Sequence, residues 1–104
     1  MEHIAFKVNY NDIKTFATKT SEKTQEELRL NNDEFKSLLH LYTYLKQAIN
    51  VCESEHKERV NIGYPLKETF STIAMLYKIV QTDDIILMLS TERLLRDMLV
   101  NELV

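Results

Sequence analysis

The sequence predicts a mainly α protein of the α+β class, in which a short N-terminal β-hairpin or meander precedes a three-helix antiparallel bundle with a long central helix. Three observations predict it: apolar residues alternate near the N-terminus, apolar rows recur at helical spacing after residue 31, and tight connections separate the expected helices. The 104 residues fit one domain, with residues 1–30 as its β part and residues 31–104 as its helical part.

The N-terminal residues favour strands. Apolar and polar side chains alternate over residues 4–10, which is typical of a strand with one buried face. Residues 11–12 (Asn-Asp) suit a tight turn, and the Thr- and Phe-rich residues 13–18 are interpreted as a second strand. Residues 25–30 alternate too and are predicted as a third strand, with a short helix opened by Thr24 as the alternative.

A long helix is predicted over residues 33–58. Asn31 followed by Glu34 is a capping-box pattern at its start. Two adjacent apolar rows follow at spacings of three and four, and they cover roughly two-thirds of the helix circumference. The rows consist of Phe35, Leu38, Tyr42, Leu45, Ile49 and Cys52, and of Leu41, Tyr44, Ala48 and Val51. His40 lies on the remaining polar stripe and is expected to be solvated, so this helix should be the central element of the fold.

The next connection holds the only glycine and the only proline of the chain. Gly63 is expected to end the long helix in the left-handed region, and Pro65 to lie in the first turn of the next helix. The second helix is predicted over residues 66–81 from one apolar row at spacings of 4, 3, 4 and 3. That row is Leu66, Phe70, Ile73, Tyr77 and Val80.

A third helix is predicted from the residues after Thr82 to about Glu102. Asp83 and Asp84 are interpreted as acids of its first turn, where they face the positive end of the helix dipole, rather than as a metal-binding or catalytic pair. The apolar run over residues 85–89 is assigned to this helix, with a buried strand as the alternative, because periodicity cannot separate the two over five residues.

Composition and charge argue against several classes of function. The net charge is −3, the pI is about 5.6 and no segment is basic, which argues against binding to a nucleic-acid backbone. A single cysteine cannot form an internal disulfide, and this favours a reducing compartment. The N-terminal residues do not resemble a signal peptide, and no apolar run reaches the length of a membrane span. We therefore expect a soluble protein of the cytoplasm.

The stretch Ile49–His56 contains the one cysteine together with two glutamates and a histidine. Cys52 and His56 are four residues apart, so both could bind one metal ion from a helix, or Cys52 could be an activated thiol. Glu53 and His56 match one half of a di-iron motif, but no second such pair occurs in the chain. Too many ligands are missing for a metal site, and we place His56 at the rim of the core.

A structural interpretation accounts for the same residues. Cys52 lies within the apolar arc of the long helix, where a lone cysteine behaves as a small hydrophobic residue. Glu53 precedes Lys57 by four residues and Glu55 precedes Arg59 by four, which is the favourable order for helical ion pairs. We therefore predict a buried Cys52 without chemistry, and no cofactor or metal.

The apolar surface that remains points to a partner. We predict a non-enzymatic protein-interaction module, a small bacterial or phage accessory protein that binds and inhibits another protein through an apolar helix face or a sheet edge. The scarcity of Gly, Pro and Trp beside abundant Lys, Asn and Ile suggests an AT-rich genome. A homodimer is a further expectation. The candidate partner surface consists of Phe6, Tyr10, Phe16, Tyr44, Val51 and Tyr64.

Two functions from other classes are kept as alternatives. One is a small metal- or thiol-dependent enzyme that uses Cys52, Glu53 and His56. The other is a dimeric regulator that binds nucleic acid through cationic side chains of the N-terminal part. These are Lys7, Lys14, Lys19 and Lys23.

Overall fold

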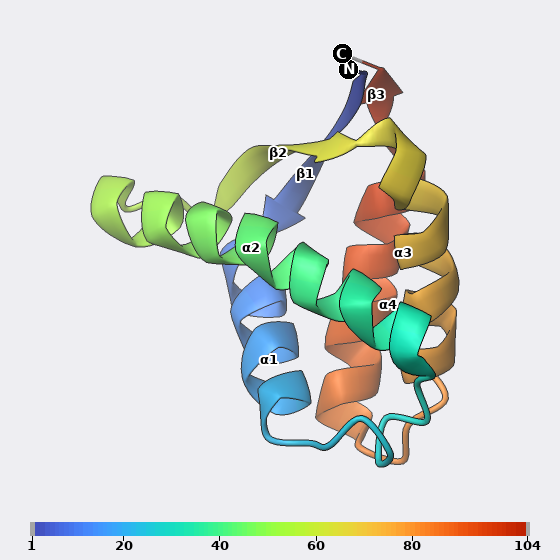
Figure 1. The fold of residues 1–104 in the computed structure, drawn as a ribbon. Helices are drawn as coiled ribbons and strands as arrows, with labels where there is room; N and C mark the ends of the chain where they lie inside the picture. Colours follow the sequence, from blue (N-terminus) through green and yellow to red (C-terminus); the bar gives the residue numbers. More distant parts are fainter. Residues whose placement is uncertain (1, 104) are drawn as a thin grey trace.

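The computed structural model describes residues 2–103 of the chain. The order of elements is β1 (His3–Asn9), α1 (Tyr10–Ser21), α2 (Asn32–Glu55), β2 (Arg59–Pro65), α3 (Leu66–Ile79), α4 (Ile85–Leu99) and β3 (Glu102–Leu103). The protein is mostly helical with a small antiparallel sheet (Figure 1), as the sequence predicts. The three-helix bundle is not confirmed, because residues 2–103 form four helices and the additional one lies in the part expected to be β.

Helix α1 replaces the predicted turn and second strand. The side chain of Asn9 caps it by accepting a hydrogen bond from the Asp12 amide at 3.3 Å. Ile13, Phe16 and Thr20 then face the core at helical spacings of three and four. The strand prediction for residues 13–18 was wrong because it followed β propensity over a short window and overlooked this local cap.

The sheet is built from distant segments rather than from an N-terminal hairpin. Its strand order is β2-β1-β3, with β1 in the middle and both neighbours antiparallel to it. Phe6 lies opposite Ile62, and Ile4 lies opposite both Tyr64 and Leu103. The predicted hairpin between residues 4–10 and 13–18 is therefore wrong.

The sequence analysis did not predict strand β2, because it assigned Gly63 and Pro65 to a connection between two helices. Gly63 lies inside β2 and does not adopt positive φ; the left-handed residue that follows α2 is His56, with φ 55°. Pro65 is the last residue of β2 and the N-cap of α3, so its prediction at the start of that helix is confirmed to within one residue. A proline at the end of an outer strand removes no sheet hydrogen bond, which explains why β2 tolerates it.

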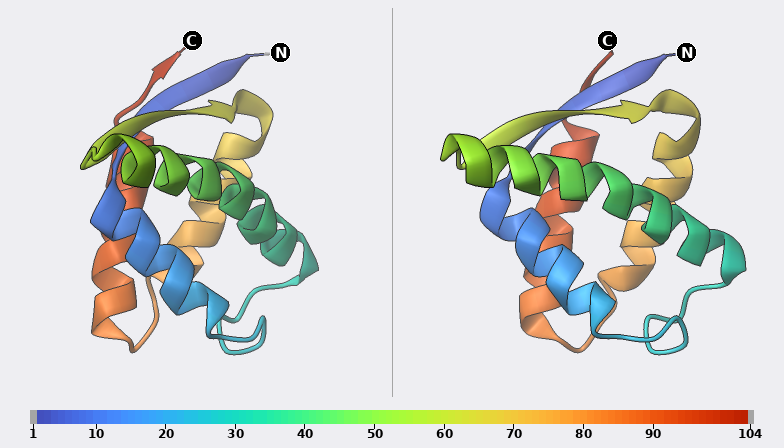
Figure 2. Two further views of the ribbon diagram at one scale, coloured as in Figure 1. Left: turned by 90° about the vertical axis from the view of Figure 1, so that its left-hand side faces the viewer. Right: turned by 60° about the vertical axis from the view of Figure 1, so that its left-hand side comes forward.

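Helix α2 is the long central helix, and it crosses the other three helices (Figures 1 and 2). Its capping box is present in full: Asn31 accepts from the Glu34 amide at 2.9 Å, and Glu34 accepts from the Asn31 amide at 2.8 Å. The helix ends at Glu55, three residues earlier than predicted. It packs against α1, α3 and β2, which agrees with its expected central place.

Residues 25–30 are neither a strand nor a helix. They form turns that connect α1 to α2. The Thr24 hydroxyl accepts from the Glu27 amide at 3.1 Å, and the Glu27 carboxylate accepts from the Thr24 amide at 2.9 Å. This reciprocal pair closes the turn, and Arg29 beyond it adopts the left-handed region with φ 60°.

Helices α3 and α4 form an antiparallel hairpin below the sheet (Figures 1 and 2). Asp84 caps α4 by accepting from the Leu87 amide at 3.1 Å, and the helix begins at Ile85, so the strand alternative for residues 85–89 is excluded. The core lies between this hairpin, α1, α2 and the inner face of the sheet. Its largest fully buried side chains are Tyr64, Phe16, Ile13, Leu38, Leu41, Leu45, Met75, Leu76, Ile79, Leu87, Leu94 and Met98.

Candidate interaction surfaces

The outer face of the α3–α4 hairpin is apolar and exposed. On α3 three members of the row that predicted the helix are exposed, Phe70 at 82%, Tyr77 at 50% and Leu66 at 36%, whereas Ile73 and Val80 are half-buried. The core side of α3 is instead formed by Thr69, Thr72, Met75, Leu76 and Ile79. Buried threonines are tolerated here because their hydroxyls are bonded; Thr69 donates to the Pro65 carbonyl at 2.9 Å. A large apolar row thus remains without a partner in the monomer.

Helix α4 contributes a second outward row, which is spaced like the first. Its members recur at 4, 3, 4 and 3 residues, are all exposed, and are Ile85, Leu89, Glu92, Arg96 and Leu99. The buried side of α4 is formed by Leu87, Ser90, Thr91, Leu94, Leu95 and Met98. Glu92 and Arg96 are flanked by apolar residues on both sides, whereas an ordinary solvated helix face is mostly polar. We call the two outward rows together the α3–α4 face.

Strand β2 forms a free edge of the sheet. Hydrogen bonds from the Leu66 amide to the Glu2 carbonyl and from the Tyr10 amide to the Glu58 carbonyl lie just beyond its two ends. In an antiparallel pair, hydrogen-bonded and non-bonded residues alternate. With the observed register, the even residues of β2 therefore bond to β1, and the odd ones direct their amides and carbonyls outward. Within residues 2–103 no strand pairs with this outer edge.

An apolar groove of about 190 Å³ runs beside this edge. One wall is formed by Tyr44, Ala48 and Val51 of α2 together with the polar Gln47, and the other by Val60–Gly63 of β2. The C-terminal turns of helix α2 extend beyond the start of β2 (Figure 1). No heavy atom lies within 4 Å of the place where a Cβ on Gly63 would be, so the outer face of β2, opposite the groove, is open at this residue. We call the edge and the groove together the β2 edge groove.

The six residues predicted as a partner surface are divided by the fold. Phe6, Phe16 and Tyr64 are buried in the core with exposed fractions of 2% or less, so they are not part of the free surface. Tyr44 and Val51 are half-buried and line the β2 edge groove. Tyr10 is also half-buried; its hydroxyl donates to Glu53 at 2.6 Å and accepts from Lys14 at 2.9 Å. Whether any of the six binds a partner stays a prediction.

His40 belongs to a cluster that the sequence did not reveal. It was expected to be solvated, but it is half-buried, with its Nδ1 in contact with the Glu68 carboxylate of α3. Its ring centroid lies 5.2 Å from that of Tyr44 and 5.8 Å from that of Tyr64. These contacts join α2, β2 and α3 beneath the β2 edge groove. No local pattern signals them, because the partners lie far apart in the sequence.

The stretch with the cysteine does not assemble a metal or thiol site. Cys52 is 2% exposed, as predicted, and burial raises the pKa of its thiol. His56 lies beyond the helix end and is exposed, and within residues 2–103 no group of three or more His, Cys, Asp or Glu side chains could hold a metal ion. His40 and Cys52 both lie on α2, twelve residues or about 18 Å apart along the helix, so they do not meet in one site.

The expected ion pairs of this stretch also differ from those observed. Glu53 pairs with Lys14 of α1 at 3.1 Å rather than with Lys57, and Lys57 pairs with Glu55 at 3.0 Å. Helix α2 ends at Glu55, so the expected partners Lys57 and Arg59 lie beyond the helix and are not one helical turn from Glu53 and Glu55. The hydrogen bonds from Tyr10 and Lys14 lower the pKa of Glu53.

The N-terminal lysines do not gather into one basic patch. Lys7 is exposed on β1, Lys14 pairs with Glu53, and Lys19 lies 3.8 Å from Asp84. Lys23 lines a pocket that also contains acidic side chains. The proposed nucleic-acid surface therefore finds no support in their arrangement.

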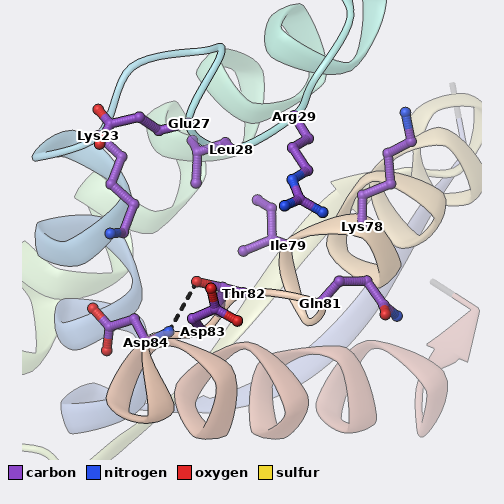
Figure 3. A pocket seen from close by; sticks show the side chains of 10 residues that line it. All are labelled: Lys23, Glu27, Leu28, Arg29, Lys78, Ile79, Gln81, Thr82, Asp83 and Asp84. Atoms are coloured by element: carbon purple, nitrogen blue, oxygen red, sulfur yellow. Dashed lines mark hydrogen bonds between the residues drawn. The ribbon is translucent and has the colours of Figure 1, made fainter.

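That pocket lies where the connection between α1 and α2 meets the connection between α3 and α4 (Figure 3), and its volume is about 280 Å³. Three of its six charged side chains already stabilise local structure. Glu27 closes the turn at Thr24, Lys78 bonds to Glu34 at 2.8 Å, and Asp84 caps α4. Asp83 and Asp84 were predicted as acids of the first turn of the last helix, but both precede the first turn, and Asp84 is its N-cap.

Comparison with protein-family models, with curated proteins and with solved structures finds no match. Among residues 2–103, no helix is both long enough and apolar enough to cross a membrane.

Proposed function

We propose that the protein is a non-enzymatic interaction module that binds an extended segment of another protein at the β2 edge groove. One observation carries this proposal: the outward backbone groups of Asn61 and Gly63 lie at a free sheet edge beside an apolar groove. Unpaired strand amides and carbonyls are a template for an added strand.

The geometry also describes the chemistry of the segment. An added strand would hydrogen-bond to the odd residues of β2, and every second side chain would point toward α2. Those side chains would contact Tyr44 and Val51, so apolar residues fit there. The alternate side chains would face solvent beside Arg59 and Asn61, which are exposed. The partner is therefore a segment with apolar residues at every second position.

Binding of this kind suits a regulator. A strand added to the edge would hold a flexible segment of the partner in one conformation, which is a direct way to inhibit it. The composition supports a bacterial or phage accessory protein, and the single cysteine supports the cytoplasm as its location.

The proposal is tested by selecting peptides from a random display library on the immobilised protein. Asn61→Pro removes an outward amide without removing a hydrogen bond to β1, whereas Asn61→Ala keeps that amide. We expect peptides with alternating apolar residues, which bind the wild type and Asn61→Ala alike and lose at least tenfold in affinity for Asn61→Pro.

Val51→Glu gives a second readout, because it places a charge in the groove and leaves the strand edge unchanged. It should weaken the same peptides. Selected peptides that bind Asn61→Pro and Val51→Glu as tightly as the wild type, or a selection without any enrichment, would show that the β2 edge groove is not a binding site. Circular dichroism of each variant confirms that the fold is retained.

A further inference from the structure

We propose that the α3–α4 face is the interface of a homodimer, in which a second copy of the chain packs antiparallel against it. This inference is independent of the β2 edge groove. It starts from two outward rows with heptad-like spacing, which is the pattern that packed helices bury between them. Phe70, at 82% exposure, is the most exposed large apolar side chain of the α3–α4 face, and a partner helix would cover it.

The row on α4 is complementary to itself when it is reversed. This holds for the four members that follow Ile85: Leu89, Glu92, Arg96 and Leu99 are apolar, acidic, basic and apolar. Two antiparallel copies placed about a two-fold axis near Leu94 bring Glu92 opposite Arg96 of the partner, and Leu89 opposite Leu99. Each contact then occurs twice, which is the defining property of a two-fold symmetric interface.

Helix α3 completes the interface. Helices α3 and α4 run antiparallel side by side (Figure 1), so the first turns of α3, which include Phe70, lie level with the C-terminal half of α4. Phe70 therefore flanks the expected two-fold axis, and Tyr77 flanks the apolar end at Ile85. The two hairpins together would form a four-helix arrangement in which all these side chains become covered.

The charge pattern favours a second copy over an unrelated helix. An unrelated amphipathic helix would satisfy the apolar residues, but it would need a matching acid and base at the same spacing to satisfy Glu92 and Arg96. The chain itself carries both at that spacing. Opposite charges across an interface fix orientation and register, and like charges placed there are unfavourable.

The experiment measures the mass of the full chain by light scattering and sedimentation over a concentration series. We expect a wild-type dimer. Glu92→Arg leaves two cations on each copy and Arg96→Glu leaves two anions, so each variant alone should dimerise at least tenfold more weakly. An equimolar mixture of the two variants should recover a heterodimer, because each cation then faces an anion.

Each variant also places like charges four residues apart within its own α4, and this repulsion is the same alone and in the mixture. Recovery of a dimer in the mixture therefore reports the contact between the two copies. Phe70→Ser should also give a monomer, with unchanged secondary structure by circular dichroism because the side chain is exposed. A wild-type monomer at every concentration would overturn the inference. Variants that remain dimers, or a mixture that stays monomeric, would overturn it as well. None of these outcomes bears on peptide binding at the β2 edge groove.

Discussion

The hydroxyl groups of Tyr64 and Thr72 lie 2.9 Å apart inside the core and join β2 to α3. Tyr64 is completely buried, and its ring makes edge contacts with Tyr44 at 4.8 Å and with Phe6 at 6.2 Å between centroids. Burial raises the pKa of Tyr64 to about 12, so the phenol stays neutral. This pair positions the strand whose outer edge we propose as the binding site.

Tyr64→Phe should destabilise the protein by about 1–2 kcal/mol, because it leaves the buried Thr72 hydroxyl without its partner. Thr72→Val should have a similar effect, and the double variant should cost less than the sum of the two single variants. Urea unfolding followed by circular dichroism measures all three. Strictly additive effects would show that the two hydroxyls do not stabilise each other.

Glu53→Gln should reduce the dependence of stability on pH in the acid range. The hydrogen bonds from Tyr10 and Lys14 lower the pKa of Glu53 in the folded state below its ordinary value of 4.5. The stability that this carboxylate contributes is therefore present above pH 4.5, and it is lost as the pH falls through the lowered folded pKa.

The measurement is the urea midpoint of the wild type and the variant from pH 6 to pH 3. We expect the midpoint of the wild type to fall more steeply than that of Glu53→Gln. Tyr10→Phe removes the hydrogen bond that lowers the pKa of Glu53 most, so its urea midpoint should fall with pH less steeply than that of the wild type and more steeply than that of Glu53→Gln. Parallel curves would mean that Glu53 titrates as it does in the unfolded chain.

Cys52→Ser should cost roughly 1–3 kcal/mol of stability, because it places a poorly paired hydroxyl in the core. In the native wild type the thiol should react slowly with a disulfide reagent, since burial both raises its pKa and restricts access. Ser54→Ala, on the exposed side of α2, is the matched control and should change stability little. Rapid native-state labelling of Cys52 would contradict its burial.

Asn31→Ala should destabilise the protein by about 1 kcal/mol, because it removes the side-chain acceptor for the Glu34 amide at the start of α2. Asn31→Asp keeps an acceptor and should be close to the wild type. Thermal unfolding measures both variants. Equal losses in the two variants would point to a role of Asn31 other than capping.

Elements with strong local signals were predictable from the sequence. The capping box at Asn31 and Glu34 located α2 to within one residue at its start. Residues 82–84 (Thr-Asp-Asp) located the start of α4, although its N-cap is Asp84 and the expected first-turn acids are absent. Helix α1 has the same kind of signal at Asn9 and Asp12, but the alternation of residues 4–10 led to its interpretation as a continuing β-hairpin.

Non-local arrangements were not predictable. Around Gly63, Val60, Ile62 and Tyr64 alternate with the exposed Arg59 and Asn61, a local pattern that could have indicated a strand. Nothing in that pattern shows that its pairing partner is the strand near the N-terminus. In the same way, the apolar row through Phe70 predicts a helix correctly but does not show that Thr72 and its neighbours take the core side. The candidate surfaces therefore became visible only in the fold.

The central position of β1 also bears on how the chain folds during synthesis. During synthesis, strand β1 must wait for residues 59–65 before it can pair on one side, and for residues 102–103 before it can pair on the other. Contacts between such distant segments close late and slow folding. Until then its apolar side chains, among them Ile4, Phe6 and Val8, stay exposed, so nascent chains interrupted before β2 should aggregate or recruit chaperones.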